Sequence, residues 1–470
     1  MSSIITSRCP ERSYASSKNL FKLRLPIAKL SPVMASILEV DSYGLLGLRK
    51  TMEEVLRGLA IYKILHMQRS KLIIDRSWCK IERKITMMQV FRRPVFFKNL
   101  IIVFAYFFWI SDLFCVDNQD SLPHINIPFI DCSLENVAGR NAGVRPIGVD
   151  GINFEQRQLG EKQVFFNTGH GGSGVCLAPG CAQEAIRRFE SMYEDFDKNE
   201  PIAVCGAGYS ALFITKFLLE KNYTVKIYAE KLPERDFMHK GEPCITSLVA
   251  AGFWKPYGMG TQDKDLYEVL ASASWNYYNE QISSLPGISM RDVYEVSDED
   301  PVQDPLLINL LGKSERVNIS MGEHNHYTPA WHYRTLLIDG NLLVNDLYEK
   351  LQLLGVLFIT RKFENEADIQ VLNEKIIFNC FGLGSKLLFG DNIMPASGQL
   401  MYLKDKEFPY FLRGYIDGQL VAFYPGSRGT TIGLSRKDGD DTHGIDSETQ
   451  EMLRIRAQEF INQLCGQCIS

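Results

Sequence analysis

Residues 201–230 read PIAVCGAGYSALFITKFLLEKNYTVKIYAE, and this stretch decides the fold. It opens with a short apolar run over 202–205, which predicts a buried strand, and continues into the turn GAGYSA at 206–211. A helical pattern follows, and a second predicted strand over 224–228 leads to Glu230. Strand, G-x-G-x-x-A turn, helix and strand in this order predict a dinucleotide-binding βαβ unit, whereas the turn alone would be a weak signal.

Each residue of the turn has a physical task in such a unit. Gly206 permits the tight turn, Gly208 lets the backbone approach a pyrophosphate, and Ala211 keeps the helix close to the strand. The start of the helix presents free N–H groups and its positive dipole end to the phosphates. Glu230 lies 22 residues after Gly208, close to where an acidic residue binds the ribose hydroxyls.

Composition sets broad limits on the protein. Its 470 residues leave room for two or three domains. The net charge is −5, but residues 1–98 hold 19 Lys or Arg and 7 Asp or Glu and so carry about +12. Outside that extension no basic patch with interleaved aromatic residues occurs, so we expect no nucleic-acid partner. The eight histidines show no ligand spacing, so we expect no metal site.

The eleven cysteines are scattered, mostly inside apolar runs or beside glycines. This placement predicts small buried side chains rather than a disulfide framework. Cys465 and Cys468 form a C-x-x-C at the extreme C-terminus, but no second pair accompanies it, and we interpret it as a loose tail.

The N-terminal part contains no catalytic motif. Residues 1–86 form a basic extension without a motif, either a lineage-specific addition or a basic membrane-surface segment. Residues 87–122 resemble a signal peptide or signal anchor, because the uncharged run LIIVFAYFFWI at 100–110 is short for a spanning helix but suits an h-region. A buried core helix is the alternative. The expected localisation is therefore exported or membrane-associated through 99–116, with cytoplasmic as the alternative.

A second glycine-rich turn precedes the βαβ unit. A predicted strand over 163–166 enters Gly169-His170-Gly171-Gly172-Ser173-Gly174, and a helix is expected to begin near Pro179. Four glycines in six residues leave a bare backbone that a flat ligand can approach closely. After the βαβ unit, further elements are expected at 333–354, 376–384, 397–402 and 420–434, and a final amphipathic helix at 447–465 with Met452, Ile455 and Phe460 on its apolar side.

With these pieces in hand, the chain resembles the D-amino-acid oxidase family of FAD-dependent oxidoreductases over about 136–464. The motifs that carry the resemblance are VCGAGYSAL (204–212), IYAEKLP (227–233), ITSLVAAGFWKP (245–256), IIFNCFGLG (376–384), ASGQL (396–400), GVRP (143–146) and NTGHGGSGVCLAPGCAQEA (167–185). The resemblance implies an α/β fold with a Rossmann-like FAD-binding domain and a substrate domain built on a mixed or antiparallel sheet.

The order of the motifs departs from the family. The last two resemble the family's carboxy-terminal signature, yet they precede the βαβ unit here. The simplest account is a circular permutation, and a truncated tandem array is the alternative. In this view residues 123–190 complete the FAD-binding unit and substrate sheet formed by residues 199–470.

The resemblance also assigns roles to single residues. Arg145 matches the arginine that binds the substrate carboxylate, and Gly172 matches the glycine whose carbonyl accepts the amine. The residues expected to hold FAD are Gly171, Gly174, Cys176, Gly206, Gly208, Tyr209, Ser210, Glu230, Lys231, Thr246, Ser247, Gly252, Cys380 and Gly382. Thr246 and Ser247 are further expected to cap a helix start and donate to phosphate.

The substrate half looks less well preserved than the FAD half. Ala422 stands where the family has a substrate-contacting tyrosine, the second tyrosine position falls near Gly418, and Phe381 replaces a threonine. Tyr415 or Tyr424 are candidates to substitute. The predicted function is oxidative deamination of D-amino acids, with an amino acid as substrate, O2 as electron acceptor and a homodimer as a candidate assembly. The alternatives are a glycine- or D-aspartate-type oxidoreductase and a catalytically degenerate, membrane-associated flavin-binding protein.

Overall fold

The computed structural model describes residues 122–233, 245–250, 252–256, 263–323, 326–404, 408–433 and 435–466, which all fall in the second of two compact units, Ile110–Ser470. The basic extension over 1–86, the signal-like segment up to 121 and Cys468 lie outside these residues. The predictions made for them therefore stay predictions.

A six-stranded sheet contains the predicted βαβ unit. Its order is β10 (Leu357–Thr360), β6 (Val225–Ala229), β5 (Ile202–Cys205), β11 (Ile376–Asn379), β4 (Lys162–Phe166) and β3 (Gln156–Leu159). All neighbours pair in parallel except β3 with β4, and β4, β5 and β11 are buried throughout. Continuous apolar runs suit such strands because helices cover both faces of a parallel sheet. The Rossmann-like expectation is confirmed.

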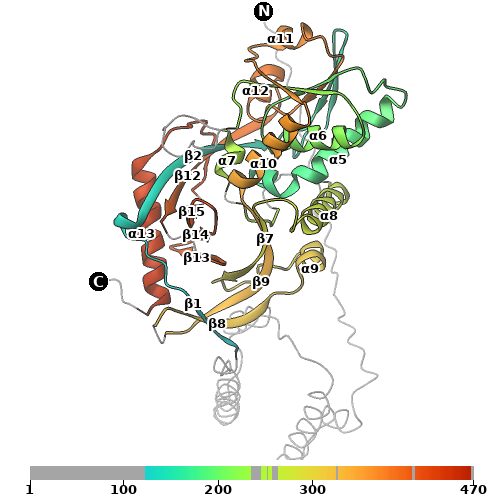
Figure 1. Ribbon diagram of the computed structural model, residues 1–470. Coiled ribbons are helices and arrows are strands. Elements are labelled where there is room, and N and C mark those ends of the chain that lie inside the picture. Colours follow the sequence, from blue (N-terminus) through green and yellow to red (C-terminus); the bar gives the residue numbers. More distant parts are fainter. Residues whose placement is uncertain are drawn as a thin grey trace, which may run out of the picture. The chain divides into compact units, whose positions relative to one another are not determined.

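The helices of this part are α5 (Gly174–Met192), α6 (Tyr209–Glu220), α8 (Lys264–Glu280), α10 (Gly340–Leu353), α11 (Glu366–Gln370) and α12 (Gly384–Phe389). Helix α5 packs against α6 and α8 (Figure 1). It begins at Gly174, so the predicted start near Pro179 is wrong. Pro179 has no N–H to offer Val175, four residues back, and the Val175 carbonyl instead accepts a hydrogen bond of 2.8 Å from the Tyr278 hydroxyl. This tertiary bond lets the helix pass through the proline.

The second sheet is mixed and has ten strands. Its strands are β1 (His124–Ile127), β2 (Val137–Gly148), β7 (Ile288–Glu295), β8 (Glu315–Met321), β9 (Thr328–Ile338), β12 (Ile393–Leu403), β13 (Phe411–Ile416), β14 (Gln419–Tyr424), β15 (Thr431–Gly433) and β16 (Lys437–Asp438). Smaller helices are α7 (Thr246–Val249) and α9 (Pro305–Leu311). Most pairs are antiparallel, while β1–β8 and β7–β13 are parallel, so the mixed substrate-domain sheet is confirmed.

The early segment of the chain belongs to both sheets. Strand β2 pairs antiparallel with β12 from Gly148–Ile393 to Arg140–Met401 and beyond, so strands about 250 residues apart in sequence lie side by side (Figure 1). Strand β4 meanwhile pairs with β11 in the six-stranded sheet. Residues 137–192 therefore supply one strand to the substrate sheet and two to the dinucleotide sheet, together with helix α5.

The final helix, α13 (Ser447–Leu464), covers the large sheet and is capped by Asp446, whose carboxylate accepts from two N–H groups of the first turn. Phe460 is buried, as predicted. Met452 and Ile455 are 42% and 44% exposed, so their assignment to the apolar side is wrong. The buried stripe consists of Gln450, Leu453, Ala457, Phe460, Ile461 and Leu464. Gln450 belongs to it because its amide donates to Asn141 and Gln399 of the sheet.

Six cysteines in the described residues are buried and carry free thiols, in agreement with the prediction of small buried side chains. Within the same residues, every helix is too short or too polar to cross a membrane.

Candidate cofactor and substrate site

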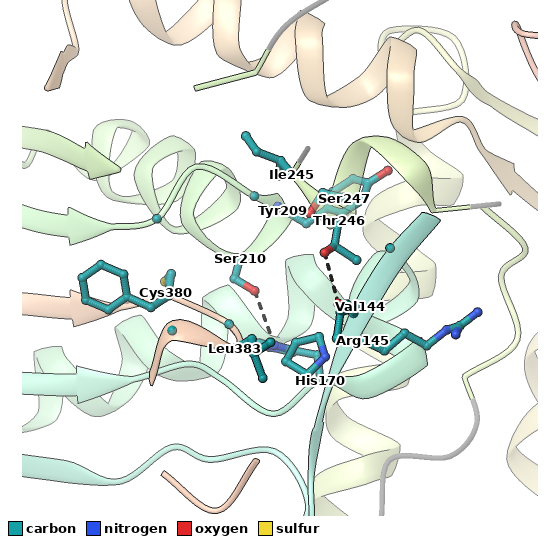
Figure 2. A pocket seen from close by; sticks show the side chains of 18 of the residues that line it. Val144, Arg145, His170, Tyr209, Ser210, Ile245, Thr246, Ser247, Cys380 and Leu383 are labelled. Atoms are coloured by element: carbon teal, nitrogen blue, oxygen red, sulfur yellow. Dashed lines mark hydrogen bonds between the residues drawn. The ribbon is translucent and has the colours of Figure 1, made fainter. Parts of the chain in front are cut away.

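A cavity of about 700 Å³ lies where the two sheets meet, a size typical of cofactor and ligand sites. Figure 2 shows part of its wall. Of the sixteen residues predicted from the sequence, all but Cys176 line it. These are Arg145, Gly171, Gly172, Gly174, Gly206, Gly208, Tyr209, Ser210, Glu230, Lys231, Thr246, Ser247, Gly252, Cys380 and Gly382.

The turn after β5 has the backbone of a phosphate cradle. Gly206 has a φ of 129°, and a Cβ there would lie 2.3 Å from the Cys380 carbonyl oxygen, so no other residue fits. A Cβ on Gly208 would meet the Ser247 hydroxyl at 2.8 Å. Helix α6 begins at Tyr209, directly behind the turn, and its first two residues, Tyr209 and Ser210, line the cavity, so the positive end of the helix dipole lies there.

Thr246 and Ser247 hold other groups than those expected. The residue that precedes helix α7 is Ile245, and neither hydroxyl caps that helix. The Ser247 hydroxyl instead accepts from the Tyr209 backbone N–H at 3.1 Å, while the Thr246 hydroxyl donates to the Val144 carbonyl at 3.1 Å (Figure 2). The predicted capping role is wrong because α7 has only four residues and its hydroxyls tie it to α6 and β2.

The second glycine-rich turn joins this cradle through a buried histidine. His170 Nε2 lies 2.9 Å from Asn167 Oδ1, and Nδ1 lies 3.4 Å from the Ser210 hydroxyl at the start of α6 (Figure 2). Burial lowers the pKa of His170 to about 4, so the ring is neutral at physiological pH. Asn167 also lines the cavity, and its Nδ2 is a buried donor without a hydrogen-bond partner in the described chain. A ligand carbonyl or phosphate oxygen would satisfy it.

Asp391 joins the loop after β4, which contains the glycine-rich turn at 169–174, to the loop after β11. One carboxylate oxygen accepts from the hydroxyls of Thr168 and Ser385 at 2.5 and 2.9 Å, and the other accepts from the Asn153 amide at 3.0 Å. The Ser385 hydroxyl in turn accepts a hydrogen bond of 2.7 Å from the side-chain amide of Asn379, at the end of β11. The loop after β4 and the loop after β11 are thereby fixed to one carboxylate.

The end of the cavity near β6 and β10 suits a ribose and base. Glu230 and Lys231 follow β6, and Arg361, Lys362 and Phe363 follow the neighbouring parallel strand β10. The carboxyl ends of adjacent parallel strands are where ligands bind in such sheets. The Arg361 guanidinium is held by the Asp368 carbonyl at 3.2 Å and lies over the Phe363 ring.

Arg145 occupies the opposite part of the wall, on strand β2. In Figure 2 its side chain extends away from His170 and Ser210. Its Nη1 lies 3.4 Å from the Ser435 carbonyl oxygen and within contact of Gly398 on β12. Leu400, Phe253 and Tyr424 line the same cavity. A cation beside apolar and aromatic walls is an arrangement that can hold a small carboxylic acid.

The position expected to hold a family tyrosine is closed off. Ala422 is fully buried, and the second position near Gly418 falls in the β13–β14 turn. Asp417 and Gly418 have φ values of 50° and 73°, as a two-residue type I′ hairpin requires. Of the two candidate substitutes, Tyr424 lines the cavity, whereas Tyr415 is 47% exposed and does not.

Cys176 is the one predicted residue that the structure places elsewhere. Its thiol donates to the Phe253 carbonyl at 3.2 Å, inside helix packing, and burial raises its pKa to about 12. The thiol acts there as a small buried group that fixes the backbone of a cavity residue. A thiol with so high a pKa is not a nucleophile.

Several residues of the wall are not predicted by the sequence. His170 lies inside the glycine-rich turn, where only the glycines indicate a ligand. Arg361 and Lys362 could have been found from their position after a strand beside β6. Asn167, Phe253, Gly398 and Leu400 lie inside the quoted motifs, but nothing in the motifs assigns them a role, and His443 lies outside every motif. Their part in the wall depends on contacts between distant segments.

The parallel sheet, the glycine cradle and the cavity define a dinucleotide-binding α/β protein. No known protein-family profile matches the chain. Curated sequence relatives include a D-amino acid oxidase from Dugesia ryukyuensis, 29% identical over 43% of this chain and 60% of its own length, and a D-aspartate oxidase from Homo sapiens, 25% identical over 57% and 77%. A D-amino-acid oxidase from Dictyostelium discoideum is 25% identical over 50% and 65%.

The chain thus spans about three fifths of the first of these relatives. The resemblance to the D-amino-acid oxidase family inferred from the motifs is confirmed by these sequence relatives. Among solved structures, an L-amino acid deaminase from Proteus vulgaris is 16% identical over 51% of this chain and 61% of that one, with a TM-score of 0.32. An FAD-dependent oxidoreductase from Pseudomonas aeruginosa is 12% identical over 58% and 75%, with a TM-score of 0.31. Scores this low carry no weight for function.

Proposed function

We propose that the chain is an FAD-dependent oxidase of amino acids that deaminates D-amino acids. The observation that carries this proposal is that one cavity is lined by the glycine cradle before α6, by Arg145 and by the three glycines of the turn at 171–174. The names of the sequence relatives support the same class of reaction.

The residues present fit FAD. The cradle at Gly206 and Gly208 leaves room for a pyrophosphate, Glu230 stands at the ribose position, and Asn167 offers a buried donor that needs an acceptor. When bound, FAD would accept the hydride from the substrate Cα and pass the two electrons to O2, which becomes hydrogen peroxide. The resulting imino acid takes up water and releases ammonia and a 2-oxo acid.

The protein's own task is to bind and orient the substrate. The guanidinium of Arg145 can bind the substrate carboxylate with two parallel hydrogen bonds, which fixes two points at once. The carbonyl of Gly172, next to the start of α5, is the proposed acceptor for the substrate amine. A substrate held at these points would pack against Phe253 and Leu400. Its Cα would then face the glycine turn, and water would be excluded.

The test is an assay of the purified protein with paired D- and L-amino acids, reading hydrogen peroxide and 2-oxo acid together. We expect both products in equal amounts from D-amino acids, and about a 100-fold loss of kcat/KM in Arg145→Ala. Arg140→Ala, on the same strand but away from the cavity, is the matched control. Products formed equally fast by Arg145→Ala would contradict the assigned role.

A D-aspartate-type substrate is the second candidate, because the human D-aspartate oxidase is matched over 77% of its length. Including D-aspartate and D-alanine in the same assay separates the two. Preference for D-aspartate would replace the neutral amino acid as the substrate.

We also propose that the chain is circularly permuted relative to these relatives. The pairing of β2 with β12 and of β4 with β11, and the short connector between α5 and β5, support it. Moving residues 123–192 behind residue 466 should restore the ordinary order and leave the melting temperature nearly unchanged. A rearranged chain that fails to fold, while the natural order folds, would favour the tandem-array alternative. Export or membrane anchoring through 99–116 remains a proposal of the sequence.

A further inference from the structure

We propose that the missing side chain of Gly398 leaves the space that the Arg145 guanidinium occupies, here called the seat, and that Asp438 on the neighbouring strand selects against ligands with a second negative charge. The proposal deepens the proposed function, because it assumes that Arg145 binds the substrate carboxylate. Residues from three neighbouring strands determine how this arginine is held and which carboxylates it binds.

The register of three strands places these residues in one row. Arg145 of β2 pairs with Ala396 of β12, and Ala396 pairs on its other side with Asp438 of β16. Directly paired residues share one face of a sheet, so Arg145 and Asp438 flank the small side chain of Ala396 on the same face. Gly398 lies two residues further along β12 and shares that face as well.

The missing side chain at Gly398 is what admits the guanidinium. A Cβ at this position would lie 2.4 Å from Nη1, 2.9 Å from Nη2 and 3.0 Å from Cζ of Arg145. Contacts this short cannot be made, so any side chain at 398 would displace the guanidinium or bend the strand. Gly398 has an ordinary φ, and the need for glycine here is steric rather than conformational.

The loop after β15 closes the seat on the far side. Nη1 of Arg145 donates to the Ser435 carbonyl at 3.4 Å, and the Ser435 hydroxyl accepts from the Gln399 N–H at 2.6 Å. The Ser397 hydroxyl donates to Asp440 at 2.7 Å, and the Gln399 amide donates to the Gly444 carbonyl at 3.1 Å. The residues on either side of Gly398 therefore fasten the loop that completes the seat.

Asp438 adds a carboxylate to this row, and both of its oxygens accept hydrogen bonds from Arg436. It forms an ion pair with Arg436 at 2.6 Å, and both Arg436 and the more distant Arg145 hold the pKa of its carboxyl below the usual range. The carboxylate is thus ionised near the seat. A single substrate carboxylate can still bind the guanidinium, but a second acidic group reaching the same face would meet the Asp438 carboxylate, whose two oxygens are already paired with Arg436 rather than with the ligand. The row favours amino acids with uncharged side chains over dicarboxylic ones.

The experiment measures binding of propionate and succinate to the purified protein by calorimetry, in the wild type and in variants at Arg145, Gly398 and Asp438. Gly398→Ala should weaken propionate binding about 100-fold, because a displacement of about 1 Å is felt at this scale. In an Arg145→Ala background the same change should have no further effect, since the two residues act as one unit. A Gly398→Ala protein that binds propionate as well as the wild type, or an effect that persists without Arg145, would overturn the role of Gly398.

Asp438→Asn should tighten succinate binding about fivefold while leaving propionate within about twofold. Asp441→Asn removes an equal charge from the exposed loop three residues away and serves as the matched control. Equal succinate binding in both variants would overturn the role of Asp438. If Gly398→Ala fails to fold, the comparison of Asp438→Asn with Asp441→Asn still tests the role of Asp438. If Arg145→Ala leaves propionate binding unchanged, the proposed function itself has failed, which is a different outcome.

Discussion

The glycine cradle at 206–211 and the row around Arg145 bind different parts of the proposed ligands and are built on different principles. The cradle lies within one βαβ unit, and its shape comes from backbone angles and absent side chains, with Gly206 at a φ of 129°. The Arg145 row uses three strands from three parts of the chain and depends on one side chain lying over Gly398. A local backbone motif survives as a recognisable sequence, whereas a site assembled from side chains of distant strands can change residue by residue.

This contrast explains the mixed preservation of family motifs. The six residues of the cradle retain the expected pattern, while Ala422 and Gly418 replace both expected tyrosines. The structure shows that the change at Gly418 comes with a tight β13–β14 hairpin rather than with an open loop. Tyr424 is the tyrosine that reaches the cavity instead.

The largest expected effect comes from breaking the cradle. Gly206→Ala forces a side chain into a φ of 129° and against the Cys380 carbonyl, so FAD affinity should fall by about 100-fold or more and stability by about 3 kcal/mol. Gly390→Ala, where φ is 65° but no atom lies within 4 Å, should cost about 1 kcal/mol and leave FAD affinity unchanged. Flavin fluorescence titration and thermal melting measure both quantities. Equal FAD affinity in the two variants would refute the cradle.

The next effect is a pH dependence set by His170, which is faced by Asn167 and Ser210 and whose pKa is lowered by burial alone. With a pKa of about 4 in the folded state against 6.5 when unfolded, the unfolded chain binds more protons between these values. Stability should therefore be fully present above pH 6.5 and fall by about 3 kcal/mol as the pH drops to 4.

His170→Gln should remove this part of the pH dependence. Melting curves of wild type and variant, recorded from pH 7.5 to about 4, provide the comparison. Parallel curves would mean that the pKa of His170 is the same in the folded and unfolded chain, so that burial does not lower it.

An intermediate effect is expected at Asp391, which joins the loops of the two segments. Asp391→Asn weakens three hydrogen bonds to a charged acceptor and should lower stability by about 2 kcal/mol, together with FAD affinity. Asp150→Asn weakens an exposed hydrogen bond that Asp150 accepts from Asn392 and should cost less than about 0.5 kcal/mol. If both variants melt alike, Asp391 does not organise the loops.

The smallest effect is expected at Tyr424. If its hydroxyl has taken over from the absent tyrosines, Tyr424→Phe should raise KM about fivefold and leave kcat nearly unchanged, as loss of one hydrogen bond would. Tyr415→Phe is the exposed control. An unchanged KM in Tyr424→Phe would show that the substrate half works without either tyrosine.

The sequence predicted the cradle and its neighbours well because glycines, strand ends and acidic termini follow one another within a few residues. It could not predict the bonds of His170 to Ser210 or of Asp391 to Thr168, since these join residues up to 223 positions apart. The sequence places the start of α5 too late because Tyr278, far along the chain, donates to Val175 the hydrogen bond that Pro179 cannot donate. The sequence does not indicate the buried face of α13 correctly, because Gln450 lies on that face and donates to the sheet, while Met452 and Ile455 are exposed.

The central claim is that the cavity holds FAD and an amino acid together. The most direct measurement is the visible flavin spectrum of the purified protein, titrated with D-alanine in the absence of oxygen. We expect the flavin absorption band to bleach with D-alanine but not with L-alanine, and to return when air is admitted. A yellow protein that no D-amino acid bleaches, or a colourless protein that takes up no FAD, would contradict it.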